Sequence, residues 1–151
     1  MRLLAIVAAA ALLTGCATAP APVESARLDP AKEEWFARSV GELAALNREA
    51  EAFLQGGKPD QAAALIEKAQ PLSSRLLAVP RPTLEAMEAV ADLDDLYGRM
   101  LLANRRYGSA RLLFQKNVAR WKYWQPQTPE TARRLKQANS EIAECDRHMA
   151  E

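Results

Sequence analysis

From about residue 29 onward, apolar residues recur at steps of three and four, the spacing of amphipathic helices. The first such stripe runs through Phe36, Leu43 and Phe53. Asp29-Pro30 predicts its N-cap and first helical residue, and Gly56-Gly57 predicts its end. Four further stripes follow, and their predicted starts are Pro59-Asp60, Thr83, Tyr107 and Thr128-Pro129.

Strand-type alternation of apolar and polar residues is absent from every window of the chain. We therefore expect an all-α domain over residues 29–151, built from about five antiparallel amphipathic helices with short connections. Pro80-Arg81-Pro82 and Gln125-Pro126-Gln127 are predicted breaks between helices. Pro71 is expected to kink or restart the second helix, because proline removes a helical hydrogen bond.

The apolar stripes also predict which side chains are buried. Cys145 and Trp121 each fall on a stripe, so we expect both in the core, Cys145 as a small hydrophobic residue. Tyr123 and Trp124 are expected to be more exposed. Asp95 and Arg99 stand four residues apart on one helix, which predicts a surface ion pair.

A weak repeat relates the predicted helix pairs at a spacing of 48 residues. Small and large apolar residues recur in the same order, as the pairs Ala50/Gly98, Phe53/Leu101, Ala62/Ala110 and Ile66/Phe114. Residues 46–69 and 97–117 thereby resemble the tetratricopeptide repeat, whose small residues let two helices cross closely. The spacing exceeds the usual value of about 34 residues. Asp94 replaces a favoured aromatic residue and Asn117 a late alanine, so a plain helical bundle is the alternative.

The N-terminus has the layout of a secretory leader. Met1-Arg2 is a positive start, and residues 3–13 form an apolar run that is shorter than the ~20 residues of a membrane span. The run ends in Leu13-Thr14-Gly15-Cys16, which resembles the lipobox of bacterial lipoproteins. That resemblance implies a cleaved leader over residues 1–15 and a covalent lipid on Cys16. An ordinary leader in which Cys16 has no role is the alternative.

Residues 16–28 predict a tether, because Pro20 and Pro22 stand among small residues and hold such a segment extended. By the sorting rule of Gram-negative lipoproteins, Ala17 after Cys16 implies the outer membrane, facing the periplasm, if the source is Gram-negative.

The residues that could perform catalysis are few. His148 is the only histidine, and the chain has no glycine-rich phosphate loop, serine elbow or paired-cysteine motif. Asp92, Asp94 and Asp95 lack the glycine turn and ligand spacing of a calcium loop. We predict a non-enzyme with no catalytic residue, no metal site and no cofactor other than the lipid on Cys16.

Charge is distributed unevenly although the formal net charge is only +1. Residues 24–95 carry 8 basic and 14 acidic side chains, whereas residues 96–137 carry 10 basic and 1 acidic. Such a local field attracts anionic partners. The candidate partner-binding residues are Arg105, Arg106, Arg120, Lys122, Tyr123, Trp124, Arg133 and Arg134. Alternatively, these cations neutralise the acidic helices within the fold.

The combined features predict a lipid-anchored protein of the cell envelope that acts as a helical, protein-binding adaptor or assembly factor. Its partners would be the membrane, through the lipid, and an envelope protein. The alternative is a module that binds anionic cell-wall glycan through its basic, aromatic-flanked surface. Nucleic acid is not an expected partner.

Overall fold

The computed structural model describes residues 29–151, and these residues form five α-helices without a strand. A single 3-10 turn, η1 (Pro30–Lys32), precedes the α-helices. They are α1 (Glu34–Gln55), α2 (Pro59–Leu77), α3 (Leu84–Ala103), α4 (Tyr107–Tyr123) and α5 (Pro129–Ala150). The predicted all-α fold of five helices is confirmed. The predicted leader, the lipid-bearing Cys16 and the tether lie outside the described residues.

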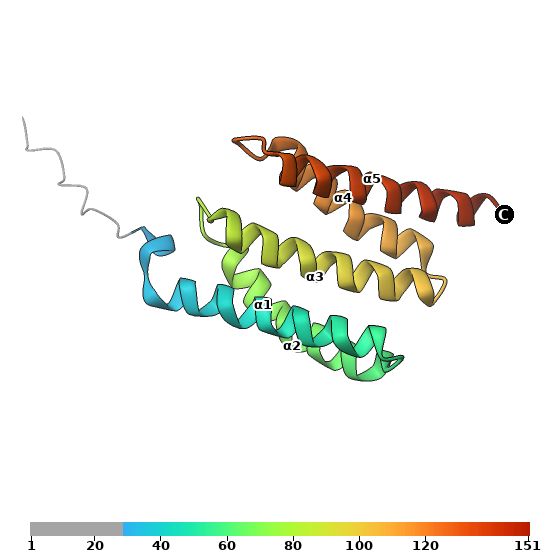
Figure 1. The fold of residues 1–151 in the computed structure, drawn as a ribbon, viewed down its shortest axis with the longest axis horizontal. Coiled ribbons are helices and arrows are strands. Elements are labelled where there is room, and N and C mark those ends of the chain that lie inside the picture. Colours follow the sequence, from blue (N-terminus) through green and yellow to red (C-terminus); the bar gives the residue numbers. More distant parts are fainter. Residues whose placement is uncertain (1–28) are drawn as a thin grey trace, which may run out of the picture.

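The helices form antiparallel hairpins that stack side by side. α1 pairs with α2, α3 pairs with α4, α3 also packs against both helices of the first hairpin, and α5 packs along α4. In Figure 1, α1, α3 and α5 run in one direction, and α2 and α4 return in the other. This arrangement matches the helical hairpins that the repeat predicts.

The domain therefore has two distinct ends. Residue 29, the α2–α3 connection and the α4–α5 connection lie at one end, which we call the proximal end (Figure 1). The turns α1–α2 and α3–α4 and the C-terminus lie at the opposite, distal end. Within residues 29–151, no helix combines the length and the apolar character that crossing a bilayer requires.

The start of the first helix differs from the prediction. The Asp29 side chain accepts a hydrogen bond from the Ala31 backbone N–H (3.1 Å), but it caps η1 and not α1. Glu33 is extended (φ −76°, ψ 144°), so the chain turns once and then begins α1 at Glu34. The extended residue places Ala31 against the main core, the buried cluster formed mostly by apolar side chains of α1, α2 and α3 together with Trp121 of α4.

Pro71 does not restart the second helix, because α2 continues through it to Leu77. Pro71 is exposed. Its missing N–H leaves only the carbonyl of exposed Glu67 without a helical donor, and water can satisfy a carbonyl there. The buried face of α2 therefore stays in phase along its whole length.

The two hairpin turns have the same geometry at a distance of 48 residues. Gly57 (φ 69°) and Arg105 (φ 58°) both adopt the left-handed conformation. The next residue, Lys58 or Arg106, donates its backbone N–H to the carbonyl five positions earlier, at 2.8 Å in both turns. The repeat thus extends from the helix crossings to the turns.

Helix crossings pack as the small residues predict. Ala62 and Ala110 are fully buried, and a Cβ added to Gly98 would stand 2.5 Å from Cε1 of Phe114. Cys145 is completely buried and Trp121 is 1% exposed, which confirms both core predictions. Burial raises the pKa of the Cys145 thiol.

Candidate functional site

The predicted basic residues do not form one surface. Arg120 donates to Asp94 Oδ2 (3.1 Å) and its side chain is only 9% exposed. Arg134 is partly buried and pairs with Asp92 (2.6 Å) and Glu130 (2.9 Å). These two cations have counterions inside the fold, as the alternative interpretation of the charge distribution proposed.

Other candidates lie at opposite ends of α4. Arg105 and Arg106 are exposed in the distal turn, whereas Lys122, Tyr123 and Trp124 lie at the proximal end. The 17 residues of α4 separate the two groups by about 25 Å. Tyr123 is 74% exposed and Trp124 is half-buried against the main core, so both are more exposed than Trp121, as predicted.

Arg133 is exposed and pairs with Glu130 one turn earlier on α5 (2.7 Å). This hydrogen bond from Arg133 lowers the pKa of Glu130 to about 2. Arg105 and Arg106 make no ion pair within residues 29–151. Arg105 also occupies a left-handed conformation that costs a non-glycine residue about 1–2 kcal/mol, a position where the first hairpin has glycine.

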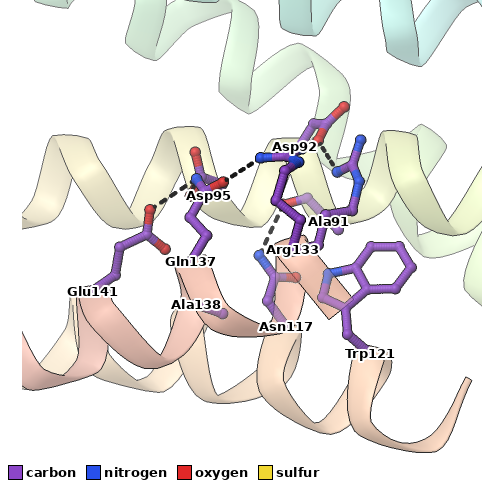
Figure 2. A pocket seen from close by; sticks show the side chains of 10 residues that line it. Ala91, Asp92, Asp95, Asn117, Trp121, Arg133, Gln137, Ala138 and Glu141 are labelled. Atoms are coloured by element: carbon purple, nitrogen blue, oxygen red, sulfur yellow. Dashed lines mark hydrogen bonds and ion pairs between the residues drawn. The ribbon is translucent and has the colours of Figure 1, made fainter. Parts of the chain in front are cut away.

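A different feature joins three helices: a polar groove across α1, α3 and α5. Each helix contributes side chains at positions i, i+3, i+4 and i+7. They are Ala44, Asn47, Arg48 and Glu51 of α1; Asp92, Asp95, Leu96 and Arg99 of α3; and Arg134, Gln137, Ala138 and Glu141 of α5. The part between α1 and α3 has a volume of about 460 Å³. The part between α3 and α5, shown in Figure 2, is narrower at about 90 Å³.

Ion pairs and hydrogen bonds cross the groove. Arg99 of α3 bonds to Glu51 of α1 and to Asp95 Oδ2 on its own helix (2.9 Å). The predicted Asp95–Arg99 pair is therefore present as part of a larger network. Gln137 Nε2 of α5 donates to Asp95 Oδ1 (3.4 Å) and to Glu141 Oε1 (3.1 Å); Figure 2 shows these three side chains.

The network shifts two carboxyl groups in opposite directions. The hydrogen bond from Arg99 lowers the pKa of Glu51. Burial, together with the hydrogen bond and the charge of neighbouring Asp95, raises the pKa of Glu141 to about 8. At neutral pH, Glu141 is therefore largely a protonated acid able to donate a hydrogen bond.

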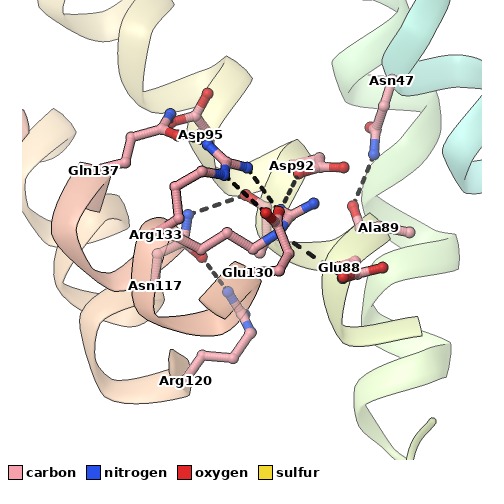
Figure 3. A network of polar contacts seen from close by, with 12 residues as sticks. Asn47, Glu88, Ala89, Asp92, Asp95, Asn117, Arg120, Glu130, Arg133 and Gln137 are labelled. Carbon is pink, nitrogen blue, oxygen red and sulfur yellow. Dashed lines mark hydrogen bonds and ion pairs between the residues drawn. The ribbon is translucent and has the colours of Figure 1, made fainter. Parts of the chain in front are cut away.

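One buried acceptor of the groove has no donor. Asn47 is 5% exposed, and its Nδ2 donates to the Ala89 carbonyl (2.7 Å, Figure 3), but its Oδ1 is buried without a partner. Leaving such an atom unsatisfied costs about 1–3 kcal/mol. Next to it, exposed Arg48 makes no ion pair within residues 29–151. An anionic group from a bound molecule would pair with Arg48, whereas Asn47 Oδ1 is closed off from the surface.

The groove offers amide, guanidinium and carboxyl groups, which are able to form hydrogen bonds and ion pairs. Across residues 29–151, no group of three or more His, Cys, Asp and Glu side chains is placed to hold a metal ion.

Sequence reasoning missed the α1 side of the groove, although a signal was present. The 48-residue spacing relates Ala44 to Asp92, Asn47 to Asp95, and Glu51 to Arg99. The repeat was recognised from apolar positions only. When the same 48-residue spacing is applied to the polar face, it relates Asn47, Arg48 and Glu51 of α1 to the groove positions of α3. The α5 positions are offset by 42 residues from α3, so the repeat gives no signal for them.

Comparison of the chain with family models, with curated proteins and with solved structures finds no match.

Proposed function

We propose that this chain is a lipid-anchored protein of the cell envelope whose helical domain binds another envelope protein, as an adaptor or assembly factor. The observation that carries the proposal is the polar groove, in which three helices present polar side chains at the same register positions. Resemblance to the tetratricopeptide repeat supports it, because lipoproteins with such domains commonly serve envelope assembly complexes.

An extended segment of a partner protein is the ligand that this groove suits best. Its backbone supplies N–H and C=O groups at regular intervals for the polar side chains that line the groove. A carboxylate on the segment would pair with Arg48. The part of the groove between α1 and α3 has the larger volume, so the segment would occupy this part.

Protein binding is favoured over anionic glycan binding by the placement of the cations. Arg99, Arg111, Arg120, Arg133 and Arg134 all have carboxylate partners within the described residues. The free cations Arg105 and Arg106 are about 25 Å from Lys122. Between them on α4, Lys116 is the one other cation of the described residues without an ion-pair partner, so a long anionic polymer would meet widely spaced positive charges there.

Partner capture from detergent-solubilised envelope tests the groove. Reversing Arg48 to Glu should reduce recovery of a stoichiometric protein partner about tenfold, since a hydrogen bond to a charged group contributes about 1.5–3 kcal/mol. Lys68→Glu makes the same charge change at an exposed position of α2 outside the groove and should leave recovery unchanged. A third variant, Arg105→Glu with Arg106→Glu, tests the basic turn separately.

Equal recovery with Arg48→Glu and Lys68→Glu would rule out the groove as the binding site. Retention of the purified protein by insoluble cell wall, with no protein partner recovered, would instead favour glycan binding.

The lipid anchor has its own test. Cys16→Ala should abolish labelling by a fatty-acid probe and leave unprocessed precursor or released protein, because the thiol is the acceptor of the lipid. A variant labelled as strongly as the parent would contradict the anchor.

A further inference from the structure

The proximal end of the domain exposes apolar side chains. Four large hydrophobic residues of the described chain are markedly exposed, and two of them, Leu77 (51%) and Tyr123 (74%), end α2 and α4 at this end. Figure 1 shows both helices ending there. Water-facing apolar side chains at the end of a helical domain are well placed for contact with another surface.

Cations accompany these apolar groups. Lys122 Nζ lies 5.4 Å from the ring centre of Tyr123, and the Arg75 guanidinium lies 4.1 Å from the ring centre of Trp35. Arg81 is exposed in the α2–α3 connection. None of the three cations has an ion-pair partner within residues 29–151.

Carboxylates of the proximal end match these three cations in number. Glu34 and Glu130 are paired with arginines, whereas Asp29, Glu33 and Glu85 have no ion-pair partner within residues 29–151. The net charge of this end is therefore small. Aromatic and aliphatic contact, and not charge alone, must dominate any binding there.

Hydrogen bonds fix the backbone next to Tyr123, at the connection between α4 and α5. Gln127 Nε2 donates to the backbone carbonyls of Trp121 (2.9 Å) and Trp124 (2.7 Å), which ties the α4–α5 connection back onto α4. Trp124 itself packs against the main core. Tyr123 is consequently presented at little cost in backbone ordering.

The chain enters the described domain at this same end. Thirteen residue steps join Cys16 to Asp29, a contour of at most about 43–47 Å. A lipid on Cys16 would keep the proximal end within this distance of a bilayer, and such tethering makes weak contacts effective. Tyr and Trp favour the headgroup region, and Lys and Arg favour anionic headgroups.

We propose that the proximal end docks onto the surface of a phospholipid bilayer, with Tyr123 and Leu77 in the headgroup region and Lys122 and Arg81 against anionic headgroups. The inference rests on the proposed lipid anchor. It orients the helix axes away from the membrane, opens the polar groove sideways, and places Arg105 and Arg106 at the end farthest from the bilayer.

Photo-crosslinking to lipid tests the orientation. Residues 17–151, preceded by a hexahistidine tag in place of Cys16, are bound to vesicles of phosphatidylcholine and phosphatidylglycerol that contain a nickel-chelating lipid. A photoreactive amino acid is placed at position 123 or 77, and as a control at position 149, where Met149 is 49% exposed near the distal end. Adducts with lipid should be at least about fivefold more abundant at positions 123 and 77 than at position 149.

The charged contacts are tested in the same vesicles. Lys122→Glu and Arg81→Glu should each lower the lipid adduct at position 77 about fivefold. Arg147→Glu, an exposed cation near the C-terminus, should leave it unchanged, and the adduct should fall when phosphatidylglycerol is omitted.

Equal adducts at positions 123 and 149, or none at positions 77 and 123, would overturn the docking proposal. Adducts at position 123 with protein instead of lipid, in envelope preparations of the parent chain, would also overturn it. The artificial tag makes these outcomes independent of Cys16, so failure of docking and failure of lipidation are distinguished.

Discussion

The two hairpins share one backbone design but solve the same packing positions with different chemistry. At three equivalent positions the α1–α2 hairpin has Leu46, Ala69 and Leu72, which belong to or pack against the main core. The α3–α4 hairpin has Asp94, Asn117 and Arg120 at these positions. There, Arg120 bonds to both Asp94 and Asn117, and Asn117 Nδ2 donates to the Ala91 carbonyl (3.0 Å).

This comparison explains the two departures from the tetratricopeptide pattern. Asp94 and Asn117 are members of one buried polar network that replaces an apolar cluster. A buried ion pair contributes little net stability compared with well-packed apolar residues, but removing one partner is costly. The second hairpin is therefore the more fragile one, and exchanges toward the residues of the first hairpin test this directly.

The largest effect is expected at Asp94. Asp94→Leu introduces the first-hairpin residue alone and leaves Arg120 buried without its carboxylate, which should lower the free energy of unfolding by about 3–5 kcal/mol. Urea unfolding followed by circular dichroism measures it.

The triple exchange Asp94→Leu, Asn117→Ala and Arg120→Leu serves as the control, since it reproduces the whole apolar cluster. It should recover most of the lost stability. If the single and triple variants are equally unstable, the polar network is not what distinguishes the hairpins.

A second difference lies at the helix crossing. At equivalent positions the first hairpin has buried Ala50 and Ile66, and the second has buried Gly98 and Phe114. Gly98→Ala would place a Cβ 2.5 Å from the buried Phe114 ring. Overpacking costs typically about 1–3 kcal/mol, which outweighs the helix propensity of alanine, up to about 1 kcal/mol.

Thermal unfolding should therefore show that Gly98→Ala is less stable than the parent chain. Adding Phe114→Ile, which restores the pairing of the first hairpin, should rescue part of the loss. An unchanged melting temperature for Gly98→Ala would mean that the ring moves aside freely.

The extent of sequence-based prediction follows from these two hairpins. Helix number, most boundaries and the burial of Trp121 and Cys145 were predictable, because local spacing and turn residues determine them. The placement of Arg120 was not. It neighbours Trp121 on α4, and only the packed helices reveal that its long side chain reaches Asp94 and not solvent. Helix rotation and cross-helix partners are tertiary facts that a periodic pattern does not contain.

The turns supply a third difference and a smaller effect. Arg105→Gly gives the second turn the residue of the first, Gly57, at a left-handed φ of 58°. Relief of the left-handed strain stabilises the folded state by about 1–2 kcal/mol. The greater backbone freedom of glycine stabilises the unfolded state by about 0.5–1 kcal/mol and opposes this gain. We expect a net stabilisation of up to about 1.5 kcal/mol in urea unfolding, whereas Arg106→Gly should destabilise the chain.

If Arg105→Gly is more stable but no longer captures the partner, the Arg105 side chain contributes to binding at the expense of stability. A destabilised variant would contradict the equivalence of the two turns.

The last difference between the hairpins is Asn47 in the first and Asp95 at the equivalent position of the second. It predicts that the stability of the chain depends on pH. Asp95 and Arg99 of α3 face Glu141, whose pKa burial and Asp95 raise to about 8 from an ordinary value of 4.5. Between pH 4.5 and about pH 8, Glu141 of the folded chain retains a proton that Glu141 of the unfolded chain has released. Stability should therefore fall as pH rises through this window and level off above about pH 8.

Replacing Glu141 by Gln should remove this decline, and Asp95→Asn, the first-hairpin residue, should flatten it by lowering the pKa of Glu141. Glu42→Gln, on the exposed face of α1, is the matched control and should keep the parent slope. Urea unfolding at pH values from about 5 to 8 measures the slopes. The lowered pKa of Glu130 acts in a separate window, because its contribution is present above pH 4.5 and is lost toward about pH 2. If the stability of the parent chain does not change between about pH 5 and 8, the pKa of Glu141 is not raised by folding. The packing of α5 beside α3 would then not depend on a protonated Glu141.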